Sequence, residues 1–431
     1  MSDFGLALVA LSFVLYALIS RRLSRSPITG PMIFVVAGIL IGPGSLDALD
    51  VSVASQGIGL LLEFALVVVL FTDAVAIDLR ALRQESFVPG RLLGIGLPLT
   101  VAAGLGTALL LFTGLGFWEA AVLAVVLAPT DAALGQAVVT NRRVPRLVRQ
   151  GLNIESGLND GLAVPVLTVF LAQAQIDAGL MSEAEIGRVF LEEIGIAAVI
   201  GTGVGYLGGK AVVFSSHKGW MGPIWRGLSV TALALLCFGV ADPLGGSGFI
   251  AAFVGGVTFG AVARSAYPDV GDHAEGVAHL LTMLSFFVFG ALMLGPSLSE
   301  LDASVAVYAV LSLSLVRLIP VRIAMIRSDV RPRTVGYLGW FGPRGLASLV
   351  FAVTIVLDSG LPNTDLIILI LTATVGLSVF AHGATAWPAS VRYADWYEGQ
   401  EAEQDEMMES AAVAHMGERR RVHPHWEREA G

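Results

Sequence analysis

The sequence predicts an all-α polytopic membrane protein with about 13 transmembrane helices, and its composition, apolar segments and loop charges all support this. Hydrophobic residues make up 55% of the 431 residues and charged residues only 14%, whereas about a quarter of a soluble domain is charged. So few charged side chains exclude a soluble enzyme, a disordered scaffold and a nucleic-acid-binding protein. The single cysteine, Cys237, excludes an intrachain disulfide and a multi-cysteine metal site.

Thirteen apolar segments follow one another along the chain, and a membrane-spanning helix needs roughly 20 such residues. They cover residues 4–20, 28–45, 53–77, 91–113, 116–139, 151–175, 186–212, 224–242, 246–265, 275–293, 303–325, 333–357 and 365–386. We number these predicted spans 1 to 13 in chain order.

Loop charge predicts the orientation of these spans. Arginine and lysine gather in the loops after odd-numbered spans, whereas Arg188 is the only basic residue in the loops after even-numbered spans. The fifth and eleventh loops, for example, carry Arg142, Arg143, Arg146, Arg149, Arg322, Arg327, Arg331 and Arg333. Because basic loops stay in the cytoplasm, we expect the N-terminus outside and the C-terminus in the cytoplasm, with the chain in the inner (plasma) membrane.

Spans 1–6 and 8–13 look like two six-helix repeats. Corresponding spans are separated by an odd number of crossings, so the two copies must have inverted topology. In each copy the fifth member is interrupted, by Pro129-Thr130-Asp131 in span 5 and by Pro343-Arg344-Gly345 in span 12. Interrupted helices at matching places of inverted halves indicate the binding site of a transporter, where the two breaks would form a crossing.

Several charged residues lie inside predicted spans, where each costs about 2.5–3.5 kcal/mol unless it is paired or hydrated. They are Glu63, Asp73, Asp131, Glu155, Asp160, Arg317 and Arg344. This cost makes each of them a candidate for pairing, hydration or function.

Span 6 combines two of these carboxylates with other oxygen donors. On a helix, Glu155 lies one turn from Asn159, and Ser156 lies one turn from Asp160. The resulting edge carries two carboxylates, a hydroxyl and an amide. These hard oxygen donors suit a small alkali cation.

The interrupted spans add further groups. Pro129 removes a backbone donor and frees carbonyls near Thr130, which are natural cation ligands. Arg344 can place positive charge near the opposite half-helix ends, and Arg317 in span 11 must find a carboxylate. From the residues alone, either arginine could be the partner of Glu155.

Three motifs in order resemble those of a known family. ESGLNDG at 155–161 resembles the ESxLNDG signature of the cation:proton antiporter-1 family, the NhaP-type sodium/proton antiporters. APTDA at 128–132 is similar to its S/A-P-T-D-P segment, and GPRGLAS at 342–348 to its G-x-R-G segment. The resemblance covers about residues 1–388 and includes the thirteen-helix plan. One departure is Ala132, which stands where the family usually has a second proline.

The resemblance implies roles for the site residues. Asp160 would bind either the cation or a proton, and Asp131, Ser156 and the main chain of Thr130 would complete the shell of the alkali cation. Asn159 stands where electrogenic relatives carry a second aspartate, which implies electroneutral exchange of one cation for one proton. Glu155 would be the structural partner of an arginine, with Arg317 favoured over Arg344.

The resemblance also implies the domain plan. Residues 1–387 would form a transmembrane antiporter domain, in which spans 4–6 and 11–13 form a moving bundle and spans 1–3 and 7–10 a scaffold that forms a homodimer. Residues 388–431 would be a polar, partly disordered cytoplasmic tail. The expected partners are membrane lipid, protons and Na⁺ (or Li⁺ or K⁺), with no nucleic acid and no cofactor beyond the transported cation.

Other functions remain open from the residues. A potassium/proton exchanger or a passive channel would use the same architecture, because residue type does not report cavity size. The segment Gly245-Gly246-Ser247-Gly248 also matches the G-x-S-G of intramembrane serine proteases, with His279 and His382 as candidate bases. A Gly-Ser run at the start of a Gly-rich span is more typical of helix packing.

Overall fold

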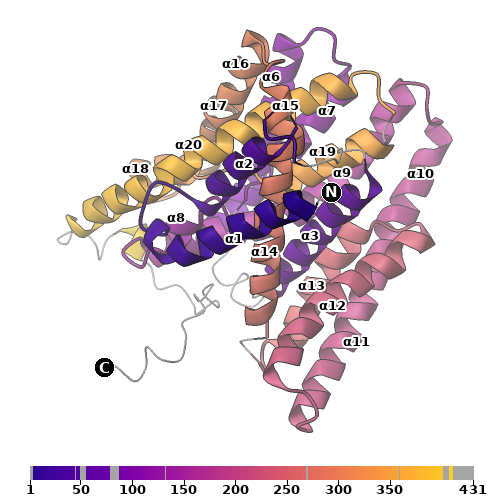
Figure 1. Cartoon of the computed structure of the whole chain (residues 1–431), viewed down its shortest axis with the longest axis vertical. Coiled ribbons are helices and arrows are strands. Elements are labelled where there is room, and N and C mark those ends of the chain that lie inside the picture. The colour runs from indigo at the N-terminus through magenta and orange to yellow at the C-terminus, as the bar shows by residue number, and fades with distance from the viewer. Residues whose placement is uncertain are drawn as a thin grey trace.

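The computed structural model describes residues 3–43, 45–48, 55–77, 87–131, 133–267, 270–358, 360–400 and 407–410, and every regular element in these ranges is a helix, with no strand among them (Figure 1). The all-α class is therefore confirmed. The remaining residues, Ala132 among them, lie outside the described part of the chain.

The helices of the first half correspond to predicted spans 1–7. They are α1 (Asp3–Leu23), α2 (Gly30–Ile41), α3 (Gln56–Val75), α5 (Phe87–Arg91), η1 (Leu92–Gly96), α6 (Leu97–Leu111), α7 (Phe117–Val126), α8 (Gln136–Thr140), α9 (Arg146–Asp177), η2 (Glu183–Glu185), α10 (Ile186–Val189), η3 (Phe190–Ile196) and α11 (Ala197–His217).

The helices of the second half correspond to spans 8–13. They are α12 (Pro223–Ala241), η4 (Asp242–Leu244), α13 (Gly248–Ala263), α14 (Asp272–Phe289), η5 (Gly290–Leu294), α15 (Gly295–Ser297), α16 (Ala303–Leu313), α17 (Leu315–Ala324), α18 (Pro332–Trp340), α19 (Leu346–Asp358), α20 (Thr364–Glu398) and η7 (Met408–Ser410).

Among the described residues, nine helices are long and apolar enough to cross a membrane, and α2, α7, α13 and α19 are shorter apolar helices. Two of these helices, α7 and α19, are short because each is one half of an interrupted span. Every predicted span therefore coincides with helical residues, whereas the count of thirteen crossings and the inverted repeat stay predictions.

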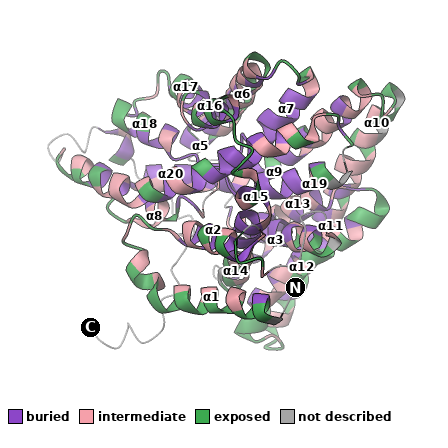
Figure 2. Ribbon diagram, turned by 45° about the horizontal axis from the view of Figure 1, so that its top comes forward, coloured by how far each residue is buried: buried purple, intermediate pink, exposed green. Residues whose placement is uncertain are grey.

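The buried core lies on the central helices of the molecule (Figure 2). The most apolar stretches of α3, α9, α14 and α20 are more than half buried, in the middle of the molecule, whereas α1 runs along an edge with Leu18 77% exposed. An exposed apolar helix is expected where lipid, rather than water, is the solvent.

Glycine allows the closest helix contacts. A Cβ on Gly205 of α11 would lie 2.3 Å from the carbonyl oxygen of Gly255 on α13, so the two backbones approach this closely only because Gly205 has no side chain. Small residues are the usual means of close approach between membrane helices, since lipid supplies no hydrophobic force to drive them together.

One face of the molecule gathers arginines, and we call it the basic face. Arg143 pairs with the end of α20, and Arg91 donates to the carbonyls of Ala324 and Ile326 at the end of α17. The start of α9 packs beside α5, where Gly151 faces Val88. The start of α18 lies there too, where Arg333 stacks on Trp396 of α20. The basic face therefore consists of α5, α8, the starts of α9 and α18, and the ends of α17 and α20.

Helix α20 does not end where the tail was predicted to begin. It continues to Glu398, so the boundary between residues 387 and 388 falls inside the helix. Met407 and Glu409 are also buried, at 4% and 2% exposure. The beginning of the predicted tail is therefore packed structure, whereas 401–406 and 411–431 lie outside the described ranges and their predicted disorder stays a prediction.

We predict that Gly205→Ala lowers the thermal stability of the purified protein in detergent, because the added methyl group would overpack the α11–α13 contact by about 1–3 kcal/mol. The matched control is Gly203→Ala on the same helix, where an added Cβ meets nothing within 4 Å. The control should melt at or above the wild-type temperature, because alanine favours a helix over glycine. Equal melting of both variants would contradict the packing argument.

Candidate cation-binding site

The two interrupted spans meet at Asp131. Its backbone N–H donates to the carbonyl oxygen of Pro343 at 2.7 Å. Its carboxylate accepts the Leu346 N–H at 2.8 Å through one oxygen and the Ala133 N–H at 2.6 Å through the other. Leu346 is the first residue of α19, so Asp131 places negative charge at the positive end of that half-helix. Gly345 makes room, because a Cβ there would overlap Asp131 Oδ2.

Arg344 places positive charge at helix C-termini, whose partial charge is negative. The side chain is fully buried, and Nη1 donates to the carbonyl oxygens of Ala128 and, at 3.4 Å, Pro129, just after α7. Its Nη2 lies 3.4 Å from the carbonyl oxygen of Ser312, near the end of α16. Carbonyls at a helix C-terminus carry partial negative charge and lack partners within the helix. The expectation that Arg344 lies at half-helix ends is met in these contacts.

Helix α9 joins the crossing through Asn159. Its Nδ2 donates to the Thr130 hydroxyl at 2.7 Å, and the Asn159 side chain is fully buried. This bond holds α9 against the interruption of span 5. The next residue, Asp160, is also buried, at 9% exposure.

A small cavity joins α9 to the crossing. Its lining includes Thr130 and Asp131 from the interruption of span 5, Ser156 from α9, and Pro343 from span 12. The other lining residues are Gly135, Val138, Val139, Leu152 and Phe341. They lie in α8 or just before it, at the start of α9, and just after α18, so the cavity lies on the basic-face side of the crossing. Asp160 is one turn beyond Ser156 and is not among the lining residues.

Glu155 pairs with Arg317. The Glu155 Oε1 and Arg317 Nη2 atoms are 2.6 Å apart, and both side chains are at most 2% exposed. Of the two arginines considered, Arg317 is thus the partner of Glu155, while Arg344 is committed to the half-helix ends. Gly342 makes room for Arg317, since a Cβ there would lie 2.6 Å from Nε.

Other sequence candidates fall outside this cluster. Ser247 is the N-cap of α13, where its hydroxyl accepts the Ile250 N–H at 3.4 Å, as a capping serine does. Asp73 of α3 faces Gly157, where an added Cβ would lie 3.7 Å from Asp73 Cβ. Asp73 therefore lies beside the helix that carries Asp160.

Sequence reasoning missed Ser378 and Ser348, which also hold the crossing. The Ser378 hydroxyl accepts the Arg344 N–H at 2.7 Å and lies 3.1 Å from His382 Nδ1. The Ser348 hydroxyl donates to the Val126 carbonyl at the end of α7, at 2.7 Å. A lone serine in an apolar span carries no signal of such a role, although Ser348 lies inside the GPRGLAS segment.

Comparison with known proteins identifies what this arrangement resembles. The family model described as "Sodium/hydrogen exchanger, transmembrane" matches residues 8–391. The solved structure of the sodium proton antiporter MjNhaP1 from Methanocaldococcus jannaschii superposes with a TM-score of 0.72 at 20% identity, covering 88% of this chain and 98% of that one. The structural match supports the fold.

The curated relatives are matched over a smaller share of their own length. A K⁺/H⁺ antiporter, NhaP, from Alkalimonas amylolytica is 26% identical over 406 residues, covering 93% of this chain and 68% of the relative. A probable Na⁺/H⁺ antiporter from Schizosaccharomyces pombe is 29% identical over 252 residues, covering 54% of this chain and 33% of the relative. The chain thus matches about one third to two thirds of the length of these relatives.

We predict that Glu155→Leu destabilises the protein by about 3–5 kcal/mol, because it leaves Arg317 buried without a counter-charge. The double variant Glu155→Leu/Arg317→Met removes both charges and should regain most of that loss. The measurement is the melting temperature in detergent of both single variants and the double variant. A wild-type melting temperature for Glu155→Leu would show that the ion pair does not stabilise the fold.

Proposed function

Because the chain belongs to the sodium/hydrogen exchanger family, we propose that it exchanges a monovalent cation, Na⁺ in the first place, for a proton across a membrane. The observation that carries the proposal is the junction between α9 and the crossing. There Thr130, Asp131 and Ser156 line one cavity, and Asn159 holds α9 to Thr130 beside Asp160.

The proposed exchange follows from competition at Asp160. An ionised carboxylate away from water is costly unless it is neutralised, and either a proton or a bound cation can neutralise it. The two occupants exclude each other. If only a neutralised site can cross the apolar barrier, the protein reorients with a cation or with a proton, and exchange results without a separate gate.

The neighbouring groups would complete the shell of the cation. Ser156 offers its hydroxyl oxygen and Thr130 its main-chain carbonyl, both hard donors. Each Asp131 oxygen already accepts a backbone N–H but has a second lone pair, so Asp131 can serve as helix cap and cation ligand together. Asn159 is neutral, which supports exchange of one cation for one proton.

The charge of the loops supports the orientation. We propose that the basic face lies in the cytoplasm of a plasma-membrane protein, with the N-terminus outside. The cavity at the crossing would then belong to an inward-facing conformation. The moving bundle would consist of α5–α9 and α16–α20, and the remaining membrane helices would form the scaffold of a homodimer. No nucleic acid and no cofactor enters this proposal.

Potassium is the alternative cation. The Alkalimonas relative is named a K⁺/H⁺ antiporter and the Schizosaccharomyces relative a probable Na⁺/H⁺ antiporter, so relatives of both kinds match this chain. Selectivity between these ions depends on cavity size and on the flexibility of the ligands.

We predict that Asp160→Asn abolishes exchange, because the amide can neither hold a proton nor neutralise a cation. Purified protein in liposomes that contain a pH-sensitive dye is given an imposed pH gradient, and Na⁺, Li⁺ and K⁺ are then added in turn. Wild-type protein should dissipate the gradient with at least one of these ions, and Asp160→Asn should match protein-free liposomes. The control is Glu300→Gln on the exposed surface. Wild-type rates in Asp160→Asn would exclude the mechanism.

We also predict that the exchange rate does not change with membrane potential, because one positive charge moves in each direction. The rate is measured with the potential clamped by K⁺ and valinomycin, and then with an imposed potential. Asn159→Asp adds a carboxylate beside Asp160 and should make exchange sensitive to the potential. A potential-dependent wild-type rate would contradict one-for-one stoichiometry.

A further inference from the structure

The last helix is longer than a membrane crossing requires. Helix α20 has 35 residues, which at about 1.5 Å per residue gives roughly 50 Å, whereas the apolar core of a membrane is about 30 Å thick. Its C-terminal part reaches the basic face beside α8 and α18 (Figure 1). There it contacts the loop that connects α8 to α9.

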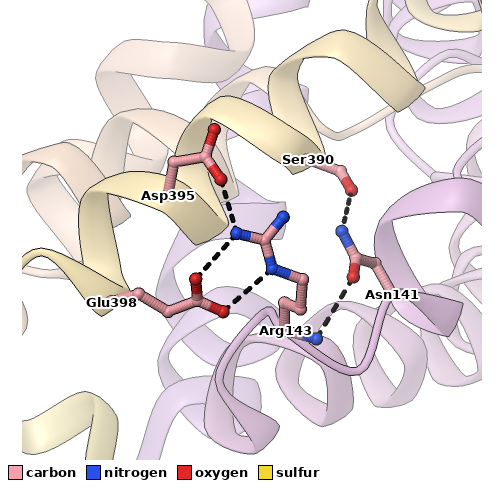
Figure 3. Close-up of polar contacts among 5 residues, drawn as sticks. All are labelled: Asn141, Arg143, Ser390, Asp395 and Glu398. Atoms are coloured by element: carbon pink, nitrogen blue, oxygen red, sulfur yellow. Dashed lines mark hydrogen bonds and ion pairs between the residues drawn. The ribbon is translucent and has the colours of Figure 1, made fainter.

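Arg143 of that loop clasps the end of α20 (Figure 3). Its Nε lies 2.9 Å from Glu398 Oε1, and its Nη2 lies 2.7 Å from Glu398 Oε2 and 2.5 Å from Asp395 Oδ1. A guanidinium that is bound through two of its nitrogens, here Nε and Nη2, is held in orientation as well as in position. We call these three residues the clasp.

Asn141 attaches the same loop to α20 a second time. Its Nδ2 donates to the Ser390 hydroxyl at 2.7 Å, and its Oδ1 accepts the Arg143 N–H at 3.1 Å (Figure 3). The loop is thus fastened to α20 at two points, two turns apart along the helix. The side chain of Asn141 also fixes the backbone from which Arg143 extends.

The clasp holds one half of the crossing. Helix α8 is only five residues long, too short to be stable without tertiary contacts. It follows the interruption at Thr130 and Asp131, and its Val138 is fully buried in a cluster with Ala386 and Ala394 of α20. The position of α8 therefore depends on α20, and the cavity wall formed by Val138 and Val139 depends on α8.

Glu409 binds the start of α18, the half-helix on the other side of the crossing. Its carboxylate is buried, and Oε1 accepts the Arg331 N–H at 3.0 Å and the Thr334 hydroxyl at 2.5 Å. Arg331 and Thr334 lie at the start of α18, the half-helix that leads to Pro343. The segment Met407–Ser410 and the end of α20 thus contact both half-helices on the basic face.

From these contacts we propose that Arg143 is a positioning residue for the cation site, which acts through α8 and lowers the KM for the cation while the clasp with Asp395 and Glu398 is closed. The proposal rests on the proposed exchange. Arg143 does not touch the ion; it limits the movement of the short helix that forms one wall of the cavity.

The exposure of the clasp makes it sensitive to salt. The side chains of Arg143, Asp395 and Glu398 are 46%, 57% and 49% exposed, and charges in contact with water are screened as ionic strength rises. Hydrogen bonds from Arg143 lower the pKa of the Glu398 carboxyl below its usual range, so Glu398 stays charged at neutral pH. Ionic strength, rather than pH, is therefore the variable that opens it.

The transport experiment compares Arg143→Gln with Arg142→Gln, the neighbouring exposed arginine, in liposomes. Arg143→Gln should raise the KM for the cation about threefold to fivefold with kcat unchanged, and Arg142→Gln should leave both unchanged. In wild-type protein, choline chloride on the basic face should raise KM by a similar factor, and Arg143→Gln should not respond. The pair Arg143→Glu/Glu398→Arg reverses the charges and should restore most of the wild-type KM.

A second measurement does not depend on transport. Hydrogen exchange of the backbone amides of residues 136–143 should be faster in Arg143→Gln than in wild-type protein, and unchanged in Arg142→Gln. Equal KM, salt response and amide exchange in the two arginine variants would overturn the proposal. A wild-type protein without cation-dependent proton flux would instead overturn the proposed exchange, and amide exchange would still decide whether the clasp holds α8.

Discussion

The structure depends on one electrostatic constraint: two helices are interrupted inside an apolar environment, and their freed backbone groups must find partners there. Each interruption supplies hydrogen-bond partners for the freed backbone groups of the other. Asp131 from span 5 accepts an N–H at the start of α19, and Arg344 from span 12 donates to carbonyls just after α7. The arrangement needs both charges, because each half-helix end of the crossing has a partial charge of its own.

This constraint changes how the charged residues of the site are understood. Asp131 and Arg344 maintain the crossing, and Glu155 and Arg317 neutralise each other. We therefore expect a substitution at any of these four positions to disturb the fold, whether or not the residue touches the ion. Loss of transport in such a variant does not by itself identify a cation ligand, so stability and transport have to be measured together.

The C-terminal end of α20 extends the same logic to the basic face. A half-helix that stops at an interruption lacks the continuity that orients a full-length helix, so its outer end needs separate support. On the basic face α8 receives this support from α20, through Asn141 and Arg143, and α18 receives it from Glu409. The region first assigned to a polar tail thus contributes to the structure of the membrane domain.

The helical class, the helical segments and the two interruptions could be predicted from the sequence, as could an oxygen-rich edge at Ser156 and Asp160 that stays a prediction. These follow from local composition, from proline chemistry and from helical spacing, which act over a few residues. The pairing of Arg317 with Glu155, and the capping by Asp131 of a helix 215 residues away, are visible only in the folded chain. The tertiary structure also revealed Ser378 and the clasp at Arg143, because such contacts depend on which distant segments pack together, and neither spacing nor residue type records that.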